Sequence, residues 1–173
     1  MKRILLTGLS GTGKSTLIAA LAARGYKAVD ADCATYSTWA EPISDPGAVG
    51  PPVEADKDWV WREDRIQSLL STEDTDVLFL GGCAENMGSF LPQFDHVVLL
   101  RAPADVLVER LRTRDNNPYG KHPDEVARVL GQVETVEPLL RRAAGHEIDT
   151  SAPLAEVVAI VLRLARSPEH GSG

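Results

Sequence analysis

The sequence predicts an α/β fold in three layers, with a central parallel five-stranded sheet flanked by helices. Short apolar runs recur along the chain, and most of them are continuous rather than alternating. Continuous runs are typical of parallel strands that are covered on both faces. Stretches with helical spacing lie between these runs, so strand and helix alternate. The 173 residues, 43% of them hydrophobic and 25% charged, are enough for one globular domain.

The expected elements follow the chain in order. Strands are predicted at residues 4–6, 28–29, 77–80, 97–100 and 147–148. Three intervening helices are marked by apolar residues at helical spacing: Leu17, Ile18 and Leu21, then Ile66, Leu69 and Leu70, then Val106, Leu107 and Leu111. A last helix over residues 154–164 has an apolar stripe of Val157, Val158, Val161 and Leu162.

One segment breaks the alternation. Residues 41–58 contain four prolines and almost no apolar periodicity, which predicts a long loop. We find no internal repeat and no linker between two cores. The expectation is a single domain over residues 1–166, with an insertion at about 33–72 and a disordered tail at 167–173.

Charge and composition narrow the possible partners. The net charge of −7 and pI near 5.1 argue against a broad contact with nucleic acid, which needs clustered Lys and Arg. No apolar stretch reaches 18 residues, so we expect a cytoplasmic protein without a membrane partner. Cys33 and Cys83 form no C-x-x-C pair, which favours free thiols over a disulfide or zinc site. The sequence leaves monomer and dimer open.

The strongest motif follows the first strand directly. Residues 8–15 read GLSGTGKS, which matches the phosphate-binding P-loop pattern G-x-x-x-x-G-K-[ST], and helical spacing follows. Backbone N–H groups of such a loop face phosphate oxygens, and the next helix adds its positive end. We therefore expect a P-loop NTPase fold that binds ATP with Mg²⁺. The predicted nucleotide-binding residues are Gly8, Ser10, Gly11, Thr12, Gly13, Lys14, Ser15 and Thr16.

Two residues of the motif have individual roles. Lys14 is expected to reach the β- and γ-phosphates and to act in catalysis. The Ser15 hydroxyl is the expected Mg²⁺ ligand, since Mg²⁺ prefers oxygen ligands and keeps several waters. The alternative, a chance glycine-rich turn, would lack the strand before it and the helix after it.

With this motif in place, the chain resembles the P-loop kinases of small metabolites and nucleotides over nearly its full length, especially the shikimate kinase and adenylate kinase groups. Asp30-Ala31-Asp32 is similar to the D-x-D segment of shikimate-kinase-like enzymes. The resemblance implies that Asp30 serves Mg²⁺ through water and that Asp32 touches the acceptor. Residues two apart on a strand point to the same side, and either carboxylate could accept the acceptor's proton. The alternative is a pair of solvated or capping aspartates.

The same resemblance implies an acceptor site. Gly81-Gly82 resembles the glycine-rich turn where a substrate approaches bare backbone, and Trp61-Arg62 resembles the segment that holds the acceptor. Either feature has a structural alternative, a tight turn for the glycines and core packing for the tryptophan.

On the nucleotide side, the resemblance implies that Arg110 stacks on adenine and that Arg114 approaches the transferring phosphate. Residues 148–153 resemble the adenine-contacting loop, and Asp149, Ser151 and Pro153 are its candidate contacts. Residues 115–122 read as a short lid. Each feature has a structural alternative. The arginines could lie on a solvated helix face, and residues 148–153 could be the N-capped start of a helix.

The chain also departs from the shikimate kinase pattern. Val136 and Glu137 stand where a second acceptor-binding arginine is expected, and no arginine lies between Asp115 and Lys121. Residues 28–61 hold seven acids and one base, which is unfavourable for an anionic acceptor. These departures put shikimate in question and make a neutral or amine-bearing acceptor plausible.

The sequence thus predicts a phosphotransferase that moves the γ-phosphate of Mg-ATP to a small-molecule acceptor: a nucleotide, a sugar or an amine-bearing metabolite. The alternative is an adenylate-kinase-like ATPase or nucleotide-dependent binding protein with a macromolecular partner, since such ATPases share a turn like Gly82-Cys83 and the Glu109-Arg110-Leu111 pattern. A nucleic-acid end kinase is disfavoured by the net charge.

Overall fold

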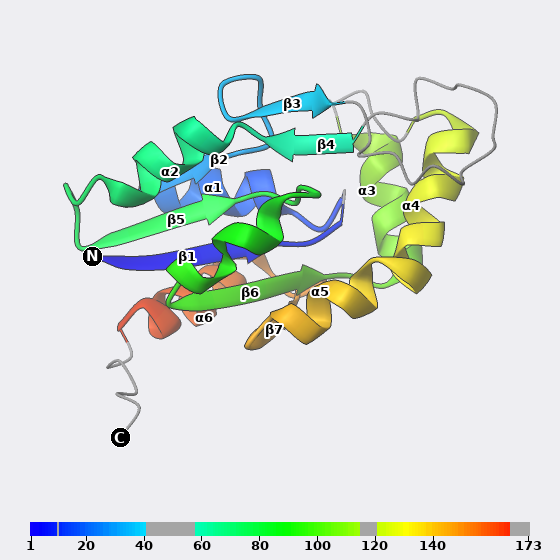
Figure 1. Ribbon diagram of the computed structural model, residues 1–173. Coiled ribbons are helices and arrows are strands. Elements are labelled where there is room, and N and C mark those ends of the chain that lie inside the picture. The colour runs from blue at the N-terminus through cyan, green and yellow to red at the C-terminus, as the bar shows by residue number, and fades with distance from the viewer. Residues whose placement is uncertain (10, 41–57, 115–120, 167–173) are drawn as a thin grey trace.

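The computed structural model describes residues 1–9, 11–40, 58–114 and 121–166. A parallel five-stranded sheet lies at the centre of the fold (Figure 1). Its strands are β1 (Lys2–Thr7), β2 (Lys27–Asp30), β5 (Val77–Gly81), β6 (His96–Arg101) and β7 (His146–Asp149), in the order β2-β5-β1-β6-β7. Each of the five predicted apolar runs is one of these strands, so the predicted α/β architecture is confirmed.

The strand register brings the polar strand ends together. Leu6 of β1 and Asp30 of β2 both pair with Gly81 of β5, so β1, β2 and β5 end at the same edge of the sheet. The carboxyl ends of parallel strands are where open α/β sheets bind ligands. The edge that carries Asp30, Gly81 and the P-loop is therefore the expected location of the site.

Alternation along β1 builds two hydrophobic cores. Ile4 and Leu6 face one core, where α1 (Lys14–Ala23) and α6 (Leu154–Arg166) pack. Leu5 faces the other core, which α2 (Glu63–Ser71) and α5 (Glu137–Ala143) help to cover. The remaining helices are α3 (Ala104–Thr113) and α4 (Pro123–Thr135). The last helix extends two residues beyond its predicted end, and its predicted stripe is confirmed at Val157, Val158 and Val161, which are buried.

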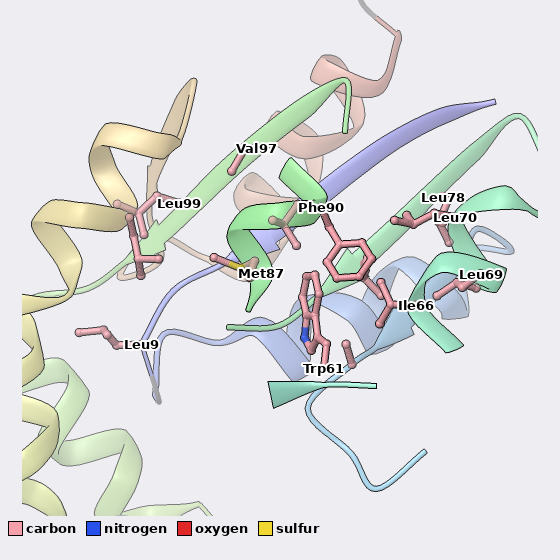
Figure 2. Close-up of a cluster of buried hydrophobic side chains, with 14 residues drawn as sticks. Leu9, Trp61, Ile66, Leu69, Leu70, Leu78, Met87, Phe90, Val97 and Leu99 are labelled. Atoms are coloured by element: carbon pink, nitrogen blue, oxygen red, sulfur yellow. The ribbon is translucent and has the colours of Figure 1, made fainter. Parts of the chain in front are cut away.

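The second core contains the short 3₁₀ helix η2 (Met87–Gln93). Figure 2 shows the Trp61 ring beside Phe90 of η2, with Ile66 of α2 close by. The Trp61 and Phe90 ring centroids lie 5.8 Å apart with the rings tilted by 58°. Trp61 is 1% exposed, so it is a core residue.

A small antiparallel hairpin stands apart from the main sheet. It consists of β3 (Ser37–Ala40) and β4 (Asp58–Trp61), with Ser37 opposite Trp61 (Figure 1). Asp58, expected in a loop, is the first residue of β4, and neither strand is predicted from the sequence, because strands of four residues show too little periodicity. Residues 41–57, the rest of the predicted loop, lie outside the described residues, as does the predicted tail at 167–173.

The start of α4 was also missed, although the sequence marks it. His122 caps the helix by accepting a hydrogen bond from the Asp124 N–H, Glu125 completes a capping box, and Pro123 occupies the first turn. His122, the last residue of the predicted lid, is therefore a helix cap. Among the described residues, no helix combines the length and apolar character needed to cross a membrane.

Candidate active site

The P-loop leaves β1 through backbone that only glycine adopts easily. Gly8, Gly11 and Gly13 have φ angles of 155°, 86° and 94°. A Cβ atom on Gly8 would lie 2.3 Å from the Leu100 carbonyl oxygen of β6. The buried Thr12 hydroxyl closes the turn by donating to the Leu9 carbonyl at 2.7 Å. The glycines of the motif are thus required by the local geometry.

Lys14 is the cation at the centre of the loop. Its Nζ donates to the Gly8 carbonyl and, at 2.9 Å, to the Leu9 carbonyl. The residue is 8% exposed, and a buried ammonium needs such partners. Phosphate oxygens are stronger partners for the same donors, so the geometry places a positive charge ready for a nucleotide.

Ser15 and Asp30 form the candidate Mg²⁺ site. The Ser15 hydroxyl donates to Asp30 Oδ2 at 2.6 Å, and Asp30 Oδ1 accepts from the Asp32 backbone N–H at 2.9 Å. Within the described ranges, no group of three or more His, Cys, Asp or Glu side chains is arranged to hold a metal. A hydroxyl and a carboxylate side by side suit Mg²⁺, which takes few protein ligands and completes its shell with water and phosphate oxygens.

A pocket of about 390 Å³ extends along the P-loop and is lined by Ser15 of this pair, whereas Asp30 is not among its lining residues. Asp32, Lys14 and Ser15 lie among its lining residues, and so do both predicted arginines, Arg110 and Arg114. Figure 1 shows that α3, which ends at Thr113, lies beyond the carboxyl ends of the strands. The remaining lining residues are Gly11, Thr12, Gly13, Thr16, Leu17, Thr113, Thr150, Ala152, Leu154 and Val157.

Arg110 is fixed by its neighbours. Its Nη1 donates to the Gly11 carbonyl at 3.2 Å and to the Thr150 hydroxyl at 2.9 Å, and its Nη2 donates to the Thr150 carbonyl. This guanidinium therefore links the P-loop to the turn after β7.

That turn differs in detail from the expectation. Thr150, Ala152 and Leu154 line the pocket, whereas the predicted Asp149, Ser151 and Pro153 are not among the lining residues. Asp149 Oδ1 accepts from the Ser151 N–H at 2.9 Å and from the Ser151 hydroxyl at 2.6 Å, which lowers the pKa of Asp149. The Pro153 carbonyl accepts from the Glu156 N–H at 2.9 Å. Asp149 and Ser151 are thus hydrogen-bonded to each other, Pro153 directly precedes α6, and their contacts with the nucleotide stay predictions.

The missed residues alternate with the predicted ones. Thr150 was detectable as the first residue after the last strand, at the edge where such sheets bind ligands. Leu154 and Val157 belong to the predicted final helix, but the sequence gives no sign that they also line the pocket.

On the other side of Asp32 lies the glycine turn after β5. A Cβ on Gly81 would come within 2.8 Å of Ile18 Cγ1, and one on Gly82 within 3.1 Å of Trp61 Nε1. The Cys83 backbone N–H donates to Asp32 Oδ1 at 3.4 Å. Burial raises the pKa of the Cys83 thiol, which keeps it protonated at neutral pH. Ile18 and Trp61 therefore occupy the space beside the two glycines, so close packing requires glycine here, and the Cys83 N–H of the turn contacts a pocket carboxylate.

Trp61 and Arg62, the other predicted acceptor residues, lie behind this turn. Trp61 is buried in the core, so its ring faces are not open for stacking on a substrate. Arg62 Nε donates to the Ala34 carbonyl at 3.1 Å, next to the Asp32 segment. Ser10 and residues 115–120 of the predicted lid lie outside the described residues, and Lys121 Nζ donates to the Arg112 carbonyl at 3.0 Å.

A parallel sheet of this strand order, with a P-loop between its central strand and the next helix, defines a P-loop nucleotide-binding protein. Comparison with known proteins agrees. A family model described as "AAA domain" matches residues 4–131. Shikimate kinase 2 of Yersinia enterocolitica is 29% identical over 170 residues, covering 93% of this chain and 94% of that protein.

Two solved structures share the fold. Shikimate kinase from Acinetobacter baumannii, in complex with shikimate, superposes with a TM-score of 0.62 at 24% identity, covering 95% of this chain and 92% of the other. A gluconokinase from Sinorhizobium meliloti gives a TM-score of 0.52 at 22% identity, covering 95% and 93%. The chain belongs to the AAA domain family. It is a P-loop phosphotransferase that uses ATP on a small molecule, as its resemblance to the shikimate kinase group predicts.

Proposed function

We propose that the chain transfers the γ-phosphate of Mg-ATP to a hydroxyl group of a small acceptor held beside Asp32. The position of Asp32 carries this proposal. Its side chain lines the pocket together with Lys14 and Ser15, and its Oδ1 accepts from the Cys83 N–H of the turn. These contacts support a role for Asp32 between the nucleotide and the acceptor.

The chemistry divides among five side chains. Asp32 orients the acceptor hydroxyl and takes its proton as the phosphate is transferred. Lys14 and Arg114, which both line the pocket, neutralise charge on the transferring group. Ser15 and Asp30 would hold Mg²⁺, which when bound supplies positive charge beside the phosphates.

The charges around the acceptor position favour a neutral or amine-bearing molecule. Asp32 faces the pocket, while the nearby cations Arg62 and Arg65 hold the Ala34 and Thr35 carbonyls of the preceding loop. These two hydrogen bonds use the guanidinium groups of Arg62 and Arg65 to stabilise the loop rather than to bind a substrate anion. Polyols, sugars and amino sugars fit this arrangement, and the hydroxylated carboxylic acids shikimate and gluconate are the comparison set suggested by the relatives.

The test is ADP release from Mg-ATP in the presence of sugars, amino sugars, amines, nucleosides, nucleoside monophosphates, gluconate and shikimate. Lys14→Ala serves as the blank, and mass spectrometry identifies the phosphorylated product. Release that depends on one acceptor class supports the proposal and names the class. Release that no small acceptor raises contradicts it, and a protein- or RNA-stimulated ATPase then becomes the better account.

A further inference from the structure

Thr150 has a buried hydroxyl with three neighbours from three different elements. The residue is 8% exposed and follows β7 directly. Its Oγ1 accepts from Arg110 Nη1 at 2.9 Å and donates to the Thr12 carbonyl at 2.7 Å, with the Arg101 carbonyl at 3.2 Å. Its backbone N–H also donates to the Arg101 carbonyl at 2.8 Å. The hydroxyl thus joins α3, the P-loop and the end of β6.

Arg110 completes the connection from the other side. Its guanidinium is planar and presents its donors in a fixed fork, so several simultaneous acceptors determine its orientation. Those acceptors are the Gly11 carbonyl of the P-loop and both the hydroxyl and the carbonyl of Thr150. Removing the Thr150 hydroxyl would remove one of the hydrogen-bond acceptors of the partly buried Arg110 Nη1.

The contact with Thr12 also has a consequence for the phosphate site. A trans peptide is planar, so the Thr12 carbonyl and the Gly13 N–H lie in the same plane and point in opposite directions. Thr150 holds the Thr12 carbonyl, which directs the Gly13 N–H away from Thr150. Backbone N–H groups of a P-loop are the groups that bind phosphate.

We propose that Thr150 is a positioning residue that sets the orientation of the P-loop backbone and of Arg110 at the same time. Thr150, Ala152 and Leu154 line one part of the pocket, and Gly11 to Ser15 line another. The network makes these two parts one rigid unit. Arg110 thereby acts on the phosphate end of the nucleotide through the P-loop, in addition to any contact with the base. The inference rests on the proposed function only in that the pocket binds a nucleotide, and it does not require transfer of phosphate to an acceptor.

The experiment measures the affinity of two probes by calorimetry, Mg-AMP-PNP and Mg-tripolyphosphate, which has no base. Thr150→Val removes the hydroxyl and keeps the branched shape, and it should weaken both probes about tenfold, as expected for losing a hydrogen bond to a charged group. Thr150→Ser restores the hydroxyl and should stay within about twofold of the original chain. Thr135→Val, at an exposed helical threonine that donates to the Gly131 carbonyl, is the matched control and should change neither affinity.

A double-mutant cycle separates positioning from general damage. Arg110→Lys keeps the positive charge but loses the fork, and it should also weaken tripolyphosphate. If Thr150 acts with Arg110, adding Thr150→Val to Arg110→Lys should cost much less than tenfold. If Thr150→Val is too unstable to measure, Arg110→Lys alone still tests the inference, because it should weaken tripolyphosphate binding, and unchanged tripolyphosphate affinity in this variant would contradict the inference.

Two results would overturn the inference. One is tripolyphosphate affinity unchanged by Thr150→Val and Arg110→Lys while AMP-PNP binding falls, which would limit both residues to contact with the base. The other is equal effects of Thr150→Val in both backgrounds. Acceptor-dependent turnover is scored separately, so a chain that binds AMP-PNP without phosphorylating any acceptor contradicts the proposed function and leaves this inference standing.

Discussion

At the scale of single residues, the site depends on pairs whose partners are far apart in sequence. Ser15 follows the P-loop lysine, and Asp30 ends β2, yet their oxygens lie 2.6 Å apart. The sequence predicted both as metal-site residues because of the motif and of the two aspartates spaced by one residue. Their direct contact is a structural finding, and it is the feature that suits a cation with few protein ligands.

Loss of either oxygen should raise the Mg²⁺ concentration needed for activity. Ser15→Ala removes the hydroxyl and Asp30→Asn removes the negative charge of the pair, and we expect each variant to raise the half-saturating Mg²⁺ concentration by about tenfold, the size of one lost charge-assisted contact. Titration of ADP release with Mg²⁺ at fixed ATP measures this. Ser89→Ala in η2 is a matched control, since the Ser89 hydroxyl donates only to the nearby Asn86 carbonyl in the contacts described. An unchanged Mg²⁺ requirement in both site variants would remove the pair from the metal site.

Several residues proposed from motif and resemblance lie at the pocket. Lys14, Asp32, Arg110 and Arg114 all line the pocket, although their roles remain predictions. Prediction from sequence missed pocket residues where neighbours in sequence face opposite ways: Thr150 and Ala152 line the pocket while Asp149 and Ser151 bond to each other. A shift of one residue in a turn depends on tertiary packing, which a single sequence does not display.

At the scale of elements, the hairpin β3–β4 shows how a side chain replaces backbone pairing. Asn86 Oδ1 accepts from the Trp61 N–H at 2.8 Å, and its Nδ2 donates to the Trp61 carbonyl at 3.0 Å. One amide thus satisfies both backbone groups of the last β4 residue. It also ties the segment after the glycine turn to the segment before Arg62.

Asn86→Ala should therefore destabilise the fold. The substitution leaves the Trp61 N–H and carbonyl without these partners, which costs about 1–3 kcal/mol of unfolding free energy. Urea denaturation followed by tryptophan fluorescence measures the loss. Gln93→Ala is the matched amide control, because Gln93 forms only an exposed hydrogen bond with Gln67 in the described contacts, and its effect should stay below about 0.5 kcal/mol. Equal effects of the two variants would show that the Asn86 contacts contribute little.

The strands of the main sheet are predictable because each is a local apolar run, whereas the hairpin depends on pairing between distant residues. Buried parallel strands are continuous apolar runs, so β1, β5 and β6 can be read directly from composition. The hairpin pairs residues about twenty positions apart, and only the folded chain shows which residues pair. The sequence signals at His122-Pro123 were present but were assigned to a lid rather than to a helix start.

At the scale of the whole molecule, β1 connects the two cores. Leu5 and Leu6 are both fully buried, and they face opposite sides of the sheet. A central strand that is shared by both cores should couple them into one cooperative unit, which is the physical basis for predicting a single domain over residues 1–166.

Leu5→Ala and Leu6→Ala should each lower the free energy of unfolding by about 2–5 kcal/mol, because each creates a cavity in a packed core. The unfolding transition should stay single in both variants, with helix content by circular dichroism and tryptophan fluorescence changing together. Leu139→Ala is a matched control, since Leu139 is 59% exposed and its loss should cost little. Two separate transitions would contradict the prediction of one domain.

The proposed role of Asp32 is to join the nucleotide pocket to an acceptor site. This role is tested by comparing Asp32→Asn with the original chain in acceptor-dependent ADP release and in Mg-AMP-PNP affinity. We expect turnover to fall about 10²- to 10⁴-fold, as for the loss of a general base, while AMP-PNP affinity changes by less than about threefold. ADP release that needs no acceptor, or that is unaffected by Asp32→Asn, would show that Asp32 does not have this role.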